Sequence, residues 1–156
     1  RKTATNVERI MPVSTPTTIY SILRDVGTIA LVGASDKPNR PSNEVMAYLQ
    51  SRGYRVIPVN PRLAGRSVLG ETAYANLADI PVAVDMADLF LATSHTDSVI
   101  DSSIELGIPV IWMQIGVINE AGAQRAEQAG VTVVMDRCPK QEIPRLGVPT
   151  VSRPPG

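Results

Sequence analysis

The sequence is poor in several residue types, and each shortage narrows the possibilities. A single cysteine in 156 residues excludes an intrachain disulfide framework and fits a reducing compartment. Aromatic residues make up only 4% of the chain, so its core must consist mainly of valine, isoleucine, leucine and alanine. No apolar run approaches the ~20 residues needed to cross a bilayer, and the N-terminus has no apolar signal core. We therefore expect a cytoplasmic protein with no membrane partner.

Net charge is lacking as well, because 15 basic residues balance 15 acidic ones. A neutral chain gives no argument for binding nucleic acid. The charges are unevenly distributed, however. Residues 36–66 carry six basic and two acidic side chains, whereas residues 67–105 carry seven acidic side chains and neither lysine nor arginine. A basic region favours a polyanionic small ligand, and solvated surface charge without a ligand is the alternative.

Short β-branched runs alternate with helical stretches of about ten residues along most of the chain. The expected strands are 28–32, 55–59, 86–92, 110–114 and 131–135, and the expected helices are 17–25, 42–51, 97–106 and 119–128, followed by a turn at 140–146. This alternation favours a parallel sheet built by right-handed crossovers. We therefore expect a three-layer α/β sandwich with five parallel strands in the order 3-2-1-4-5 and helices on both faces.

The length of the chain fits one domain. Residues 1–16 are polar and show no period, so we expect a flexible arm there. Residues 17–147 carry the alternating pattern and form the expected domain, with Thr17 or Thr18 as the cap of its first helix. Residues 148–156 are rich in proline and are expected to be disordered.

Gly33 directly follows the first expected strand, where ligands bind in a doubly wound sheet. Glycine allows a sharp turn there and leaves room for a ligand. Ser42 is a natural cap for the next helix, whose N-terminal N–H groups and dipole favour phosphate. The full GxGxxG fingerprint and the P-loop are both missing, so phosphoryl transfer from ATP is unsupported. A glycine that only closes a strand–helix turn is the alternative.

The second expected strand ends in Asn60, Pro61 and Arg62, where an NAD enzyme usually places a carboxylate. Asn60 can bond a ribose or a base, and Pro61 stiffens the loop. Arg62 can pair with a phosphate through two N–H groups. The pattern points to a nucleotide with an additional phosphate, either the 2′-phosphate of NADP or the 3′-phosphate of coenzyme A.

Several segments together resemble the small CoA-binding domain family, which also appears in the succinyl-CoA synthetase alpha chain and in ADP-forming acyl-CoA synthetases. These segments are VGAS (32–35), RPS (40–42), GYRVIPVNPR (53–62), WMQIGVINE (112–120) and VVMDRCP (133–139). The resemblance covers residues 20–146. It implies a Rossmann-type domain that binds coenzyme A or an acyl-CoA without catalysis, as a sensor, a carrier or a partner of an enzyme that acts on acyl-CoA. We expect a monomer or a weak homodimer.

By position, the resemblance implies that the glycine turn faces the diphosphate, that the end of the second strand holds the adenosine, and that the end of the fourth strand lines the pantetheine path. Arg137 could steer a phosphate or simply stay hydrated. The expected ligand-binding residues are Gly33, Ala34, Ser35, Lys37, Arg40, Ser42, Asn60, Pro61, Arg62, Thr93, Gln114, Gly116 and Arg137.

One segment departs from the family pattern. After the third strand the family commonly reads Asp-x-Phe-Arg, whereas here Asp88 and Phe90 are followed by Leu91. A cationic contact to the ligand is therefore lost, which leaves open a regulatory interaction module that no longer binds a ligand. An NADP-dependent oxidoreductase is the other alternative, although no Tyr–Lys pair or comparable acid is suitably spaced.

No catalytic residue and no metal ligand is assigned from the sequence. A nucleophilic pair of Cys138 and His95 lacks a third orienting group. His95, Asp97 and Asp101 lack a recognised zinc spacing, and solvated aspartates are the simpler interpretation. Trp112 lies in an expected central strand, where core packing is favoured over stacking on adenine.

Overall fold

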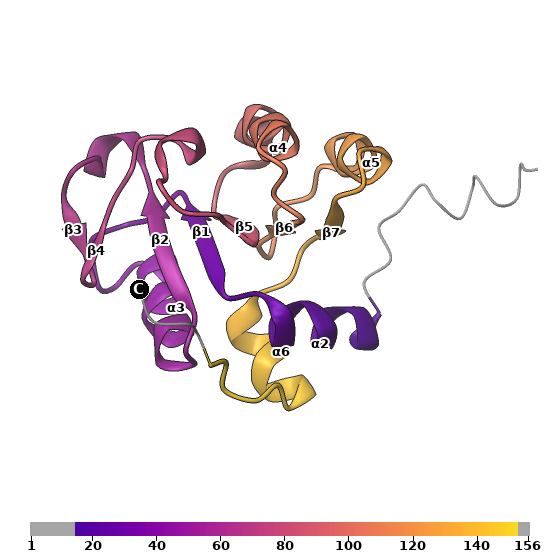
Figure 1. Ribbon diagram of the computed structural model, residues 1–156, viewed down its shortest axis with the longest axis horizontal. Helices are drawn as coiled ribbons and strands as arrows, with labels where there is room; N and C mark the ends of the chain where they lie inside the picture. The colour runs from indigo at the N-terminus through magenta and orange to yellow at the C-terminus, as the bar shows by residue number, and fades with distance from the viewer. Residues whose placement is uncertain (1–14, 153–156) are drawn as a thin grey trace, which may run out of the picture.

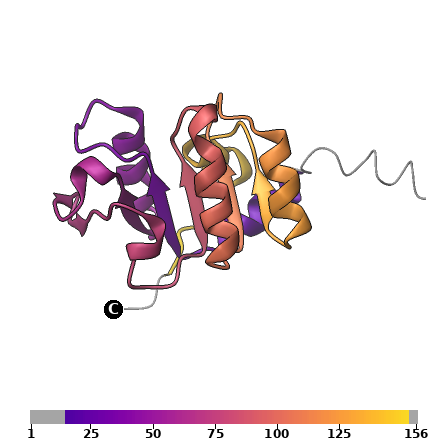
Figure 2. The same cartoon turned by 90° about the horizontal axis from the view of Figure 1, so that it is seen from above.

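The structure, a computed structural model, describes residues 15–152, and a central sheet separates two layers of helices (Figures 1 and 2). One face of the sheet is covered by α2 (Pro16–Asp25), α3 (Pro41–Ser51) and α6 (Pro139–Leu146), and the other by α4 (Thr96–Glu105) and α5 (Glu120–Gln128). The expected three-layer α/β sandwich is confirmed. Each helix among the described residues is too short or too polar to span a membrane.

The central sheet contains five parallel strands. They are β1 (Thr28–Val32), β2 (Arg55–Val59), β5 (Met86–Leu89), β6 (Val110–Met113) and β7 (Thr132–Val134). Their spatial order is β2-β1-β5-β6-β7, which is 2-1-3-4-5 when these strands are numbered along the chain. The parallel sheet is as expected, but the third strand is not where the order 3-2-1-4-5 puts it. It pairs with β1 and β6 rather than lying outside β2.

The connection between β2 and β5 accounts for this order. It contains the 3-10 turns η1 (Pro61–Leu63) and η2 (Leu77–Asp79) and a small antiparallel hairpin of β3 (Ser67–Val68) and β4 (Glu71–Thr72), but no α-helix. Leu77 of η2 packs in the same apolar cluster as Ile100 of α4. The connection therefore crosses on the α4 face, and a right-handed crossover on that face carries the chain past β1.

Apolar layers fill both sides of the sheet. On the α3 face, Ile29 and Leu31 of β1 pack with Leu23 of α2 and Met46 of α3. Trp112 of β6 is fully buried in this layer, and its indole N–H donates to the carbonyl oxygen of Arg137 at 2.8 Å. Trp112 is therefore a core residue, as expected from the sequence, and its ring is not available to stack on a ligand.

The starts of two helices correct the expected caps. α2 is capped by Thr15, whose side chain accepts the N–H of Thr18, so the helix begins at Pro16 and not at residue 17 or 18. α3 begins at Pro41, and Ser42 is buried within its first turn instead of capping it. The rest of the expected N-terminal arm, residues 1–14, lies outside the described residues.

The segment after α6 packs onto the fold as far as it is described. Val148 is buried, and the N–H of Val151 donates to the carbonyl oxygen of Arg52 at 2.8 Å. The guanidinium of Arg52 in turn donates to the carbonyl oxygen of Val148 at 2.8 Å. The expectation of disorder from residue 148 onward is therefore wrong for residues 148–152, while residues 153–156 lie outside the described part.

Candidate ligand-binding site

The carboxyl ends of β1 and β5 meet at the point where the direction of strand addition reverses. From β1 the chain continues through α3 to β2 on one side, and from β5 it continues through α4 to β6 on the other side. In doubly wound sheets, ligands bind in the crevice at this switch point. Because the third strand lies beside β1, the glycine turn faces the end of β5 and not the end of the fourth strand.

The chain after β5 passes so close to Gly33 that a side chain does not fit there. Its φ is +91°, and a Cβ at this position would lie 2.1 Å from the carbonyl oxygen of Phe90. The N–H groups of Gly33 and Ala34 both donate to the carbonyl oxygen of Val59, at 2.9 and 3.3 Å. They are therefore used within the fold. Within residues 15–152, the next backbone N–H, that of Ser35, donates to no protein atom, which leaves it open to an anion.

Two asparagine side chains hold the loop after Gly33 in place. Asn60 donates to the carbonyl oxygen of Ala34 at 2.8 Å and accepts the N–H of Arg62 at 2.9 Å, so it ties the loops after β1 and β2 together. Asn43 of α3 donates to the carbonyl oxygen of Ser35 at 2.9 Å. Asn43 was not among the expected site residues, because a single buried amide in a helix carries no motif. These bonds order the loop before any ligand arrives.

A first cavity of about 470 Å³, here called the glycine-loop cavity, opens above this loop. Eight expected site residues line it: Gly33, Ala34, Ser35, Lys37, Arg40, Ser42, Asn60 and Arg62. Three of them are exposed cations, Lys37, Arg40 and Arg62. The acidic side chain in its lining, Asp36, is paired with Arg66 at 3.5 Å. The cavity is therefore cationic.

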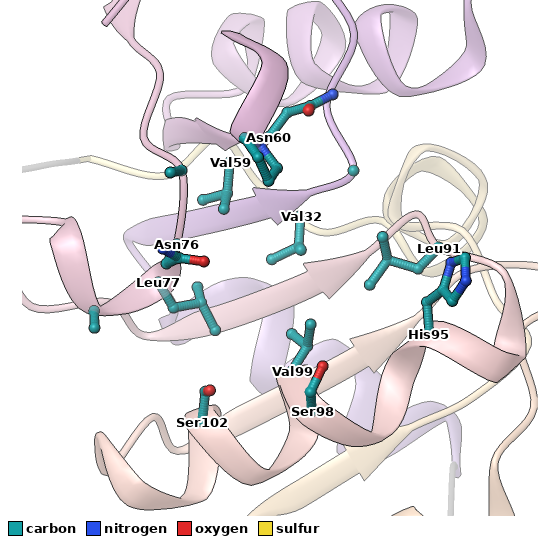
Figure 3. Close-up of a pocket in the computed structure, with 14 residues that line it drawn as sticks. Val32, Val59, Asn60, Asn76, Leu77, Leu91, His95, Ser98, Val99 and Ser102 are labelled. Atoms are coloured by element: carbon teal, nitrogen blue, oxygen red, sulfur yellow. The ribbon is translucent and has the colours of Figure 1, made fainter. Parts of the chain in front are cut away.

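A second cavity of about 570 Å³, the crossover cavity, lies between the β2–β5 connection and α4. Figure 3 shows its walls. Val32 and Val59 come from the ends of β1 and β2, and Leu91 and His95 lie toward one end. The remaining labelled side chains are Asn60, Asn76, Leu77, Ser98, Val99 and Ser102. Its lining also contains Gly33 and Asn60, which the glycine-loop cavity shares. The sequence did not single out Asn76, Ser98 or Ser102, because these positions belong to no recognisable motif.

A third cavity of about 700 Å³, the Gln114 cavity, adjoins the other two. Pro41 and Phe90 line both this cavity and the glycine-loop cavity, and Leu91 lines both this cavity and the crossover cavity. The three cavities are therefore neighbours along one edge of the sheet. Gln114 is only 6% exposed, and its Oε1 atom has no hydrogen-bond partner among the described residues.

Asp88 lies on the central strand beneath this edge and lines none of the three cavities. It is fully buried, in register with Leu31 and Trp112, and neither carboxyl oxygen has a partner among the described residues. Burial raises the pKa of Asp88 well above its ordinary range, because a charge there would be removed from water. The fold therefore favours the neutral acid.

The residues considered for catalysis lie in different cavities, and the aspartates considered for metal binding form ion pairs with an arginine. His95 lines the crossover cavity, whereas Cys138 lines the Gln114 cavity. Asp97 and Asp101 both pair with Arg125, at 3.2 and 3.1 Å. Hydrogen bonds from Asn119 and then Arg125 lower the pKa of Asp97. Among residues 15–152, no three His, Cys, Asp or Glu side chains are placed to hold a metal ion.

Residues 27–144 match the CoA binding domain family. The chain belongs to this family. The uncharacterized protein YneT of Bacillus subtilis (strain 168) is 37% identical over 122 residues, which are 78% of this chain and 89% of that protein. The resemblance first recognised from the sequence motifs is thereby confirmed.

Solved structures agree with the family assignment. A hypothetical protein from Pyrococcus horikoshii OT3 has a TM-score of 0.82 and 39% identity, covering 86% of this chain and 95% of that one. A dinucleotide-forming acetyl-coenzyme A synthetase from Ca. Korarchaeum cryptofilum has a TM-score of 0.60 and 25% identity. That likeness covers 71% of this chain but only 26% of the synthetase. A fold similar to this one thus occurs both as a short chain and as part of a larger enzyme.

The structure brings ten of the thirteen expected site residues of this CoA binding domain to the three cavities. The other three, Thr93, Gly116 and Arg137, line none of them. The hydroxyl of Thr93 accepts the N–H of Ile118 at 3.3 Å, and the N–H of Gly116 donates to Asp136 at 2.7 Å. These backbone contacts stabilise the loop after β6.

Proposed function

We propose that this chain binds coenzyme A or an acyl-CoA, without catalysis, across the three neighbouring cavities at the carboxyl edge of the sheet. The observation that carries the proposal is the cationic glycine-loop cavity at the switch point, with two further cavities adjoining it. A ligand with a polyanionic diphosphate between two less charged ends matches this arrangement of cavities. Such a protein would act as a sensor, a carrier or a partner of an enzyme that uses acyl-CoA.

The diphosphate is assigned to the glycine-loop cavity. Lys37 and Arg40 supply positive charge, and the open N–H of Ser35 supplies a directed donor. Charge-assisted hydrogen bonds to phosphate are about twice as strong as neutral ones. Because Asn43 and Asn60 already fix the loop, little conformational entropy is lost when the phosphates bind.

The adenosine is assigned to the crossover cavity. Val32 and Leu77 offer apolar surface to the base, while Asn76, Ser98 and Ser102 offer hydrogen-bonding groups to the base and ribose. Arg62 follows Pro61 of this cavity and lines the glycine-loop cavity, which suits a contact with the 3′-phosphate. The pantetheine arm then extends toward Gln114.

Replacing Arg62 by alanine tests this orientation. The variant should bind coenzyme A more weakly by about 1.5–3 kcal/mol, because a charge-assisted contact is lost. The backbone N–H of Arg62, which Asn60 accepts, stays in place. Dephospho-CoA, which lacks the 3′-phosphate, should lose far less affinity. Equal losses for the two ligands, measured by isothermal titration calorimetry, would refute the contact.

Arg24→Ala is the charge-matched control. Arg24 lies on α2 and pairs with the neighbouring Asp25, away from the cavities. Titrations with NADPH and ATP complete the test. Tight binding of coenzyme A alone supports the proposal, whereas tight binding of NADPH would favour an oxidoreductase. If none of these ligands binds, the result would favour a regulatory module that no longer binds a ligand.

A further inference from the structure

We infer that the Gln114 cavity binds the aliphatic acyl group of a medium-chain acyl-CoA, so that the ligand is the thioester and not free coenzyme A. This inference rests on the proposed function and names its ligand more narrowly. It follows from the chemistry of the cavity, from an unpartnered buried acceptor within it, and from its continuity with the cationic cavity.

The walls of the Gln114 cavity are mostly apolar. Val45 of α3, Phe90 and Leu91 after β5, and Ile115 and Val117 after β6 all contribute to its lining. Its volume of about 700 Å³ lies in the range of cavities that enclose a drug-sized ligand, roughly 300–1,000 Å³. A thiol and two short amide links would leave much of this apolar surface in contact with water. An alkyl chain would cover it.

Gln114 supplies the polar contact that positions the chain. The residue is 6% exposed, and its Oε1 atom finds no donor among the described residues although it lines the cavity. A buried acceptor without a donor is unfavourable, and a ligand N–H that reaches it removes this penalty. The pantetheine amide next to the thioester carries such an N–H. The rest of the lining is apolar apart from Glu44, Lys140 and Gln141.

The continuity of the cavities sets the direction of the ligand. Pro41 and Phe90 line both the glycine-loop cavity and the Gln114 cavity, so a chain leaving the diphosphate can pass between them. Leu91 stands where the family commonly has arginine, and it lines the Gln114 cavity as well. An arginine there would bring a charge next to the acyl group, whereas leucine extends the apolar wall.

Calorimetric titration with coenzyme A, acetyl-CoA, butanoyl-CoA and octanoyl-CoA tests the inference. Each methylene that becomes buried should raise the affinity by about four-fold until the cavity is filled. The affinity for octanoyl-CoA should therefore exceed that for acetyl-CoA by more than about tenfold. If coenzyme A binds but chain length has no effect, this inference is overturned and the proposed function stands. If no CoA compound binds, both are overturned.

Two isoleucines of the same loop provide a matched pair of variants. Ile115 is 54% exposed and lines the cavity, whereas Ile118 is 46% exposed and lines none of the three cavities. Ile115→Asp should lower the affinity for octanoyl-CoA by a larger factor than the affinity for coenzyme A, so that the preference for the longer chain is lost. Ile118→Asp should retain the preference for the longer chain. Equal behaviour of the two variants would show that the acyl group does not enter this cavity.

Discussion

Replacing Asp88 with asparagine should stabilise the protein near neutral pH. Asp88 is fully buried on the central strand, and its two carboxyl oxygens have no partner among the described residues. Burial raises the pKa of Asp88, so the folded protein retains a proton that the unfolded chain releases at an ordinary aspartate pKa. The asparagine amide is nearly the same size and does not titrate.

The sign and size of the effect follow from the proton balance. Below the unfolded pKa both states hold the proton, and Asp88 is no more costly than asparagine. Between the unfolded and the folded pKa, the folded state holds one proton more, so its stability falls by about 1.4 kcal/mol per pH unit as the pH rises. The gain from Asp88→Asn should therefore be near zero in acid and should increase with pH.

Urea unfolding of the two proteins, followed by circular dichroism from acid to neutral pH, measures this difference. The difference in unfolding free energy should have the slope given above. A constant difference across the pH range would refute the reasoning, because it would mean that Asp88 titrates alike in both states. Asp88→Leu is a useful second variant. It also removes the unpartnered oxygens, each of which costs about 1–3 kcal/mol, and should stabilise the fold at every pH.

Four other substitutions test the fold and the loop. Gly33→Ala should destabilise the protein by about 3 kcal/mol or more in urea unfolding, because its Cβ would collide with a carbonyl oxygen. Gly65→Ala shares the positive φ but has open space, so it should cost only about 1 kcal/mol, and equal costs would contradict the collision. Tyr54→Phe should cost about 1–3 kcal/mol, since the buried hydroxyl donates to the carbonyl oxygen of Leu23. Burial raises the pKa of Tyr54 to about 12, so stability should fall as the pH rises above the unfolded value of about 10, and this alkaline loss should be absent in the phenylalanine variant. Asn43→Ala should weaken coenzyme A binding by roughly 1 kcal/mol in calorimetry, because the loop loses an anchor, and unchanged affinity would mean that the anchor is dispensable.

The sequence predicted the strands best where local chemistry decides the outcome. β1 and β2 have the expected bounds, because glycine precedes or follows a short run of buried β-branched residues. β5 ends at Leu89 and not at Ala92, since Phe90 already belongs to the turn that passes over Gly33. Periodicity cannot detect this, because the residues remain apolar after the strand has ended.

The strand order and the crossover cavity could not be predicted from local sequence patterns. The position of β5 depends on which face the preceding connection crosses, and this is decided by long-range packing of Leu77 against the α4 layer. The cationic loop was predicted because glycine, lysine and arginine stand close together in the sequence. Asn76 and Ser98 lie on different elements, and only the fold brings them to one cavity.

The wall of the crossover cavity has a consequence for how this family can diversify. Residues 75–78 contribute to that wall but belong to a connection and not to a strand of the central sheet. Apart from Leu77, which packs against the α4 layer, such a segment can change in composition without disturbing the pairing of the strands. If the proposed ligand binds here, new preferences for its adenosine end should therefore arise in this segment, and a mutant library aimed at altered recognition should be directed to it and should spare Gly33 and Leu77.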